Sequence, residues 1–438
     1  MRFSDNILKI RINKEDMFRI EEIALIFFFS GNSITYLVGR LMGLIGLSAV
    51  SSLGVLVIHT ITVIGIVIGL LRLNRSRLFK CLAFLFFIFM LILFSYILNP
   101  EIGIWLSDST YGIGSIFGLD GHIFSGGVIA FYVLITQKDP DRIIRALKIS
   151  VLILSVYLFL MFYHRMVNGY FIVEGASGLR QTEYNMSFGY YCAFASTLLY
   201  IFWIDSKRKI YIFTSIIFAA LAVSFGSRGV IITYALFIVS LLWTSLRSVK
   251  ISRRLFFILL IGIFAFFIVN FYSEIVLGIQ YLFKSMGISN SRTISILASS
   301  DIFDSNGRDD LWSLGTSLIK DKFPLGYGFF GERTIIGNIV RWGYVHNVIL
   351  ELVIEFGIIG VVILIFMLYK TCLFINNDSN KKWNLLFIVF FSNCGILLVS
   401  NSFWYCPYFW GTIAVGVLYN KLIKSQVFDR KVGGFIDV

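Results

Sequence analysis

The sequence predicts an all-α polytopic membrane protein with about 12 transmembrane helices and a large helical loop before the tenth. Composition supplies two observations: 58% of the 438 residues are hydrophobic and only 14% are charged, with a mean hydropathy of +0.84. Soluble domains carry about 25% charged residues, so this much apolar surface indicates a lipid environment. The third observation is a succession of apolar runs, each near the roughly 20 residues that cross a bilayer.

Twelve apolar runs meet this length loosely, and we predict one helix in each. The boundary between the first two is poorly defined, because only Arg40 interrupts the apolar stretch around it. The predicted spans are residues 22–39, 48–71, 79–98, 121–137, 146–163, 184–204, 210–225, 229–246, 255–273, 345–369, 383–401 and 405–421.

Basic residues orient these spans. With the N-terminus in the cytoplasm, 27 of the 38 Lys and Arg residues fall in segments that alternate to the cytoplasmic side, as the positive-inside bias requires. Both termini are then cytoplasmic, and the net charge of +13 indicates this bias rather than a nucleic-acid partner. We expect one membrane domain, residues 1–438, with longer loops on the outer face at 99–120, 164–183 and 274–343.

The outer loop at 274–343 is long enough to be functional or structured. It shows helical patterning in "SEIVLGIQYLFKSMG" and in "GRDDLWSLGTSLIKD". Because the cytoplasmic loops are short, the working face of the protein is predicted to be the outer one.

Three arginines of the outer face are candidates for binding an anion. Arg180 lies in "GLRQTEYN", Arg228 in the tight turn "SFGSRGV", and Arg308 at the start of "GRDDLW". The planar guanidinium fork matches phosphate oxygens with paired hydrogen bonds, so a cluster here suits a pyrophosphate headgroup. The alternative is that each is an interfacial side chain or a local ion pair.

His346 and Asn347 lie where the long loop enters the predicted span 345–369. Histidine titrates near neutrality and can accept a proton from a hydroxyl group. An interfacial, hydrogen-bonded histidine is the alternative. Glu351 and Glu355 follow one helical turn apart on one face. Because carboxylates inside spans are costly, they are expected to face the interior, as a proton relay, a partner for arginine or a structural pair.

Other site classes find no support in the sequence. The five cysteines are scattered, with no C-x-x-C pair and no metal-ligand spacing. The glycines of "FPLGYGFFGER" follow no predicted strand, so they do not indicate a nucleotide-binding turn. No Walker motif is present, which argues against an ATP-driven pump.

Together these features resemble the O-antigen ligase and polymerase superfamily, the Wzy/WaaL group of membrane glycosyltransferases. The resemblance rests on "LRQTEYN", "SRG", "GRDDLW", "PLGYGF" and the spacing H-N-x9-G-x-x-G from His346 to Gly360, in that order over residues 180–360. Each motif is short, but the order and the shared outer face make the set specific.

The resemblance implies glycosyl transfer from an undecaprenyl-diphosphate-linked oligosaccharide at the periplasmic face of a bacterial inner membrane, with no cofactor and no metal. His346 is then expected to be the catalytic proton acceptor in an inverting displacement. Pyrophosphate or substrate is expected to bind Arg180, Arg228, Arg308 and Asn347. Supporting roles are expected for Glu351, Glu355, Trp312 and Tyr344.

The acceptor separates two members of this superfamily. A polymerase joins one lipid-linked repeat unit to another, and a ligase moves the finished chain to lipid A–core. We favour the polymerase, for which a chain-length regulator of the Wzz type is an expected partner beside membrane lipids. A flippase for the same lipid-linked sugar is a third reading, although its charges would follow a central path instead of gathering at one face.

Overall fold

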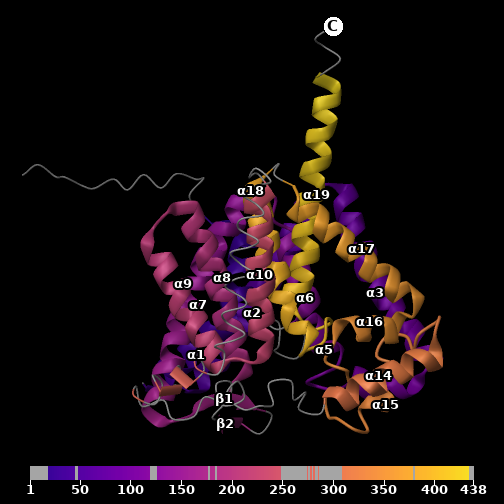
Figure 1. The fold of residues 1–438 in the computed structure, drawn as a ribbon, viewed down its shortest axis with the longest axis horizontal. Helices are drawn as coiled ribbons and strands as arrows, with labels where there is room; N and C mark the ends of the chain where they lie inside the picture. Colours follow the sequence, from indigo (N-terminus) through magenta and orange to yellow (C-terminus); the bar gives the residue numbers. More distant parts are fainter. Residues whose placement is uncertain are drawn as a thin grey trace, which may run out of the picture.

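The computed structural model describes residues 18–44, 48–118, 126–175, 178–182, 185–247, 308–377 and 380–433, with a few positions between 274 and 285. Within these ranges the chain is helical almost throughout and forms one two-stranded sheet (Figure 1). The all-α prediction is therefore confirmed. The predicted span 255–273 and most of the first half of loop 274–343 lie outside the described residues.

The described helices are connected by segments of different lengths. In chain order they are α1 (Ile20–Leu44), α2 (Ser48–Leu71), α3 (Arg75–Leu98), η1 (Pro100–Ile102), α4 (Gly103–Leu106), α5 (Ile113–Phe117), α6 (Gly127–Ile135), α7 (Pro140–Asn168), α8 (Met186–Ser206), α9 (Lys209–Phe225), α10 (Arg228–Arg247), α14 (Arg308–Lys322), α15 (Arg333–Ile336), α16 (Val348–Phe356), α17 (Ile358–Ile375), α18 (Lys381–Asn393), η3 (Cys394–Leu398) and α19 (Pro407–Gly433). Strands β1 (Phe171–Gly175) and β2 (Gly178–Thr182) pair antiparallel, with Val173 opposite Arg180.

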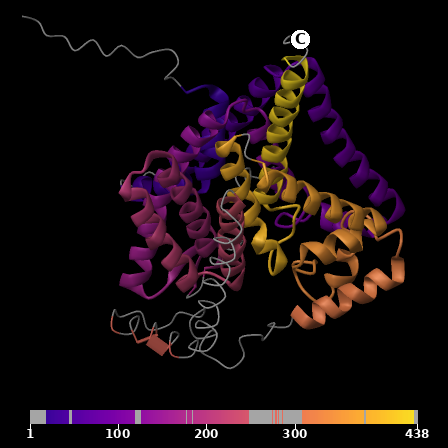
Figure 2. The same ribbon diagram turned by 45° about the horizontal axis from the view of Figure 1, so that its top comes forward.

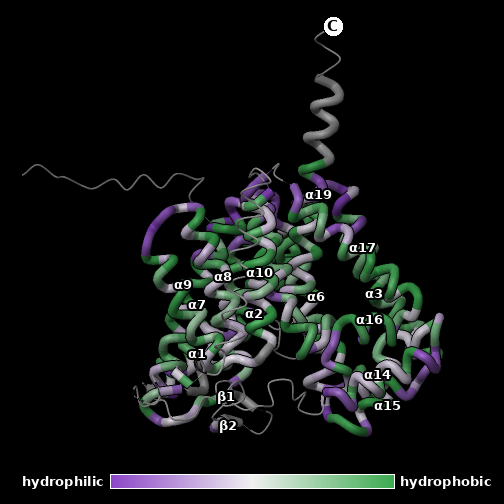
Figure 3. The backbone as a smooth tube through the Cα atoms, viewed as in Figure 1, coloured by the Kyte–Doolittle hydropathy of each residue, from purple (hydrophilic) through white to green (hydrophobic). Residues whose placement is uncertain are grey.

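Burial divides the long helices into a centre and a periphery. In α8 and α18, 72% of the apolar stretch is buried, whereas in α3 and α17 the share is 22% and 17%. Large apolar side chains such as Phe86 and Phe366 are exposed on these outer helices, which are green along most of their length in Figure 3. Apolar side chains exposed along a whole helix suit contact with lipid chains.

Eight helices in the described part of the chain are long and apolar enough to cross a membrane, and each overlaps a predicted span. The predicted span 210–225 is α9, whose 17 residues fall just short. Of the predicted span 121–137, the described part holds α6, with nine residues. The predicted span 345–369 is two helices, because Gly357 turns the chain with φ of +55°. The membrane-crossing candidate there begins at Ile358.

Ion pairs hold one end of the bundle together. Glu22 of α1 is fully buried and binds Arg142 and Arg145 of α7, each at 2.6 Å. Glu21 binds Arg72, just beyond α2, at 2.7 Å. Because a buried carboxylate is costly without a partner, these pairs fix the start of α1 against α2 and α7.

Helices α14, α15 and α16 gather at the opposite end, near the level of the β1–β2 hairpin (Figure 1). Figures 1 and 2 both place α19 between this group and α7–α10. The helix predicted in "GRDDLWSLGTSLIKD" is α14, which confirms that pattern. Its buried residues Leu311, Gly315 and Leu318 recur every three or four positions, so one face packs on the group.

The glycine-rich turn "PLGYGFFG" caps the end of α16. Backbone N–H groups of Tyr327 and Gly328 donate to the carbonyls of Ile354 and Glu355, each at 2.8 Å. These carbonyls lie in the last turn of the helix, where no intrahelical donor is available. A Cβ on Gly357 would lie 2.0 Å from the Pro324 carbonyl oxygen, so the two segments can meet only with glycine there.

We therefore expect Gly357→Ala to destabilise the protein by about 2–4 kcal/mol, since it combines a backbone clash with a positive φ. Thermal unfolding of the purified protein, followed by fluorescence-detected size exclusion, measures this loss. Gly39→Ala is the matched control, because a Cβ at Gly39 meets nothing within 4 Å. Equal unfolding midpoints for the two variants would contradict the role of the turn.

Candidate functional site

His346 lies at the turn that leads into α16, and two aromatic rings enclose it. Its ring centroid is 4.7 Å from that of Tyr344 and 4.9 Å from that of Trp342. Its φ is +54°, a left-handed conformation that costs a non-glycine residue about 1–3 kcal/mol and is common at functional sites. The surrounding packing must therefore hold His346 in this conformation.

Arg308, the first residue of α14, is the charged neighbour of His346. Burial, followed by the positive charge of Arg308, lowers the pKa of His346 from 6.5 to about 4. The charge of Arg308 also acts on Tyr190 of α8. The imidazole is therefore neutral at pH 7 and able to accept a proton.

Tyr190 joins this region to the turn between α9 and α10. Ser227 donates a hydrogen bond of 2.6 Å to the Tyr190 hydroxyl. The turn can lie this close to α8 because Gly189 has no side chain. A Cβ on Gly189 would be only 2.2 Å from the Cα of Gly226. Arg228 follows Ser227 and begins α10, so its backbone lies beside the same hydroxyl.

Asn347 is the N-cap of α16. Its side-chain oxygen accepts from the backbone N–H of Ile349 at 3.0 Å and of Leu350 at 3.3 Å. Its amide nitrogen donates to the Leu398 carbonyl at 3.4 Å. The observed role is therefore structural, and binding of substrate by Asn347 stays a prediction.

Glu351 and Glu355 face the interior, as expected, with exposed fractions of 0% and 1%. Glu351 accepts hydrogen bonds from the Ser402 hydroxyl and from the Phe403 backbone N–H. Glu355 accepts from the indole Nε1 of Trp404, at 2.9 Å and 3.1 Å to its two oxygens. Both carboxylates thus hold α16 against residues 402–404, and a role in the reaction stays a prediction.

Arg333 is a second buried charge of this end of the molecule. It is fully buried and donates to the Tyr111 carbonyl at 2.8 Å and to the Tyr405 hydroxyl. Its Cζ lies 3.2 Å from the ring centroid of Phe330, a cation–π contact. Arg333 therefore connects the loop at 99–120 through Tyr111, the segment before α15 through Phe330, and the segment before α19 through Tyr405.

The structure brings some of the predicted site residues together. The charge of Arg308 acts on His346, Tyr344 contacts His346, and Trp312 lies one turn after Arg308 on α14. Arg180 is in β2 and Arg228 begins α10, but their side chains lie outside the described part of the chain. Their contact with a substrate stays a prediction.

Sequence reasoning missed several residues that shape the site. Tyr190, Ser402 and Trp404 carry no motif, and each meets partners far along the chain. Glu332 and Arg333 do carry a signal, since two opposite charges follow the apolar turn "FPLGYGFFG". Two opposite charges directly after such an apolar turn can therefore indicate a buried ion pair.

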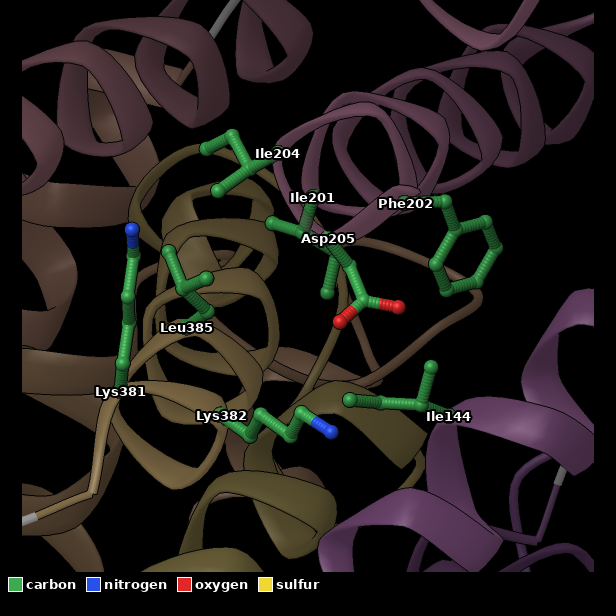
Figure 4. Close-up of a pocket in the computed structure, with 8 residues that line it drawn as sticks. All are labelled: Ile144, Ile201, Phe202, Ile204, Asp205, Lys381, Lys382 and Leu385. Carbon is green, nitrogen blue, oxygen red and sulfur yellow. The ribbon is translucent and has the colours of Figure 1, made fainter. Parts of the chain in front are cut away.

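A cavity of about 200 Å³ lies where α7, α8 and α18 meet (Figure 4). The lining residue Asp205 is 15 positions from Tyr190 on α8, about 22 Å along the helix axis. The cavity therefore lies far along α8 from the Tyr190–Ser227 contact. Two of its three charged side chains form ion pairs: Asp205 binds Lys148 at 3.1 Å, and Lys382 binds Asp141. We interpret it as a gap between diverging helices.

Comparisons with known proteins agree with the motifs. A family described as O-Antigen ligase matches residues 213–365. A Rickettsia conorii protein provisionally named a polysaccharide ligase is 28% identical over 130 residues, which is 27% of this chain and 32% of the relative. No solved structure matches. The resemblance to the Wzy/WaaL superfamily is thus confirmed, and neither finding separates ligase from polymerase.

Substitution of Trp404 tests whether its hydrogen bond to Glu355 stabilises α16. We expect Trp404→Phe to lower the free energy of unfolding by about 1–3 kcal/mol, because the buried Glu355 carboxylate loses a donor. Trp243→Phe is the control, since the Trp243 indole bonds an exposed asparagine side chain. Thermal unfolding in detergent compares the two, and equal midpoints would argue against this role of Trp404.

Proposed function

We propose that this protein transfers a glycan from undecaprenyl diphosphate to a sugar hydroxyl at the outer face of a bacterial inner membrane. The family match over residues 213–365 supports the reaction class. The observation that carries the proposal is His346, held in a left-handed conformation between the rings of Trp342 and Tyr344, where the charge of Arg308 acts on a neutral imidazole. A fixed cation beside a neutral base suits a reaction in which a diphosphate leaves and a hydroxyl loses its proton.

In the proposed step the acceptor hydroxyl attacks the anomeric carbon as the bond from that carbon to the diphosphate oxygen breaks. The electron pair of that bond leaves with the diphosphate, whose charge Arg308 stabilises, together with the predicted ligands Arg180 and Arg228. His346 takes the hydroxyl proton. One in-line displacement inverts the anomeric configuration, and the step uses no metal ion and no cofactor.

Binding of the diphosphate is expected to change the strength of His346 as a base. In the free protein the charge of Arg308 disfavours the imidazolium. A bound diphosphate brings negative charge and offsets that effect, so the pKa of His346 rises toward the operating pH. The base is therefore stronger when the leaving group is present, by the part of the shift that Arg308 causes in addition to burial.

Buried nitrogens near the base suit a carbohydrate. The indole Nε1 atoms of Trp312 and Trp342 and the Nδ1 of His346 are buried without a hydrogen-bond partner among the described residues. Such groups are costly unless a ligand satisfies them. Sugar hydroxyls both donate and accept, so a glycan can satisfy all three.

The acceptor is the finer part of the proposal. We favour another lipid-linked repeat unit, which makes the protein a polymerase and a chain-length regulator its expected partner. Transfer to lipid A–core is the second candidate, because the matching family is described as a ligase and the relative carries a ligase name.

Complementation separates the two acceptors. In a strain without its polymerase, we expect this chain to restore long glycans on undecaprenyl diphosphate, visible as a ladder on gels. In a strain without its ligase, restored transfer of preformed chains to lipid A–core would instead identify the second candidate. The glycans of the host must match the specificity of the protein for either outcome.

His346→Ala tests the proton acceptor in the same strains. We expect activity to fall by at least about 100-fold, the usual effect of losing a general base, at an unchanged level in the membrane. His164→Ala is the control, because His164 lies at the end of α7 and contacts Tyr170. Full activity of His346→Ala would remove the general-base role.

Arg308→Gln tests the charge that acts on His346. Removing the cation raises the pKa of His346, so the protonated, inactive form persists to higher pH. The acidic limb of kcat/KM, near pH 4 if His346 alone sets it, should move to higher pH. Arg341→Gln, at an exposed arginine of the same loop, should leave the limb in place. An unmoved limb in Arg308→Gln would contradict the coupling.

A further inference from the structure

Three carboxylates from two segments meet in the interior behind His346. Glu332 precedes α15, and Glu351 and Glu355 lie on α16, with exposed fractions of 0%, 0% and 1%. One carboxylate oxygen of each lies within 4.8 Å of the others. Arg333 is the cation beside them, with its Nε 3.9 Å from Oε1 of Glu332. One guanidinium balances only one of three ionised carboxylates.

Glu332 differs from the other two carboxylates because its charged neighbours are Arg333 and Glu355, with no hydroxyl or indole donor among the described residues. Glu351 receives hydrogen bonds from Ser402 and Phe403, and Glu355 receives them from Trp404. In contrast, neither oxygen of Glu332 has a hydrogen-bond partner among the described residues. Arg333 compensates part of the desolvation of Glu332, but three buried carboxylates beside one guanidinium leave negative charge that a cation or protons must neutralise.

We propose that Glu332, Glu351 and Glu355 bind one divalent cation of the calcium type. Three carboxylates offer up to six oxygens, and Ca²⁺ takes about 6–8 oxygens at about 2.3–2.6 Å. Oxygens on opposite sides of such an ion are about 4.6–5.2 Å apart, which agrees with the observed spacing of up to 4.8 Å. The charges then sum to zero, because Arg333 supplies one positive charge and the ion supplies two.

Burial favours Ca²⁺ over Mg²⁺. Mg²⁺ usually keeps several water ligands, and the three carboxylates are closed to solvent. The donors on Glu351 and Glu355 orient these carboxylates as acceptors, in the way that outer hydrogen bonds orient metal ligands. The sequence did not indicate this site, since its ligands are not at a metal-site spacing along the chain.

The ion would join the glycine-rich turn to α16. Glu332 follows that turn, and α16 begins directly after the His346–Asn347 pair. An ion at this point therefore fixes α16, and with it the position of His346 just before that helix. The ion takes no part in the transfer itself. This inference concerns binding and stability, so it stands or falls separately from the proposed glycosyl transfer.

A proton is the competing occupant. Burial raises the pKa of Glu332 to about 8, so without an ion this carboxyl would be neutral at pH 7. The two accounts differ in what the purified protein binds, which an experiment can measure directly.

The test uses the full chain in nanodiscs, treated with EGTA and then titrated with CaCl₂ or with Tb³⁺. We expect one Ca²⁺ per chain by equilibrium dialysis and a higher unfolding midpoint in CaCl₂ than in EGTA. Tb³⁺ emission excited through tryptophan should appear and be displaced by Ca²⁺, since the Trp404 indole contacts Glu355.

Glu332→Gln should weaken Ca²⁺ binding at least about tenfold and abolish the calcium-dependent rise of the midpoint. Glu101→Gln, at an exposed glutamate, is the matched control and should behave as wild type. If Glu332→Gln does not fold, the wild-type comparison of CaCl₂ with EGTA decides. Wild-type protein that binds no Ca²⁺ and unfolds at the same temperature in both would overturn the proposal in favour of protons, as would undiminished binding in Glu332→Gln.

Discussion

Two buried carboxylates on one short helix organise the end of the molecule that carries the site. Glu351 and Glu355 of α16 are closed to water, and a buried carboxylate without donors costs several kcal/mol. Their donors come from Ser402 and Trp404, 51 and 49 positions further along the chain. The need to satisfy these two groups fixes α16 against the segment before α19, and His346 at the start of α16 takes its position from that contact.

Backbone geometry allows this arrangement, because the turns around α16 leave no room for side chains. A Cβ on Gly326 would lie 2.6 Å from the Glu355 carbonyl oxygen, and one on Gly357 2.0 Å from that of Pro324. Trp105 fills the space beside Gly337 and Gly343, where a Cβ would lie within 2.0 Å and 2.8 Å of its ring. The loops at 99–120 and 323–347 are therefore packed supports of the site, and they hold His346 in its left-handed conformation.

The motifs marked candidate residues of the site but not the contacts that support them. "GRDDLW" and "HN" mark Arg308 and His346, which the fold brings into one electrostatic environment. The motif "HN" also suggested Asn347 as a substrate ligand, but its side chain is the N-cap of α16. The Tyr190–Ser227 contact could not be predicted, since a tyrosine in an apolar helix has the same pattern whether it packs on lipid or on a turn. Its partner is 37 positions away.

The sequence by itself determined the class of the fold, the helix α14 and most of the membrane-crossing helices, because length, hydropathy and helical period are local properties. It also determined that His346 and Arg308 are the polar groups to examine. Only the tertiary structure decided that the run at 345–369 is two helices, and that Glu332, Arg333, Glu351 and Glu355 share one buried cluster. Both depend on contacts between distant segments, where close backbone approach and the compensation of buried charge decide the outcome.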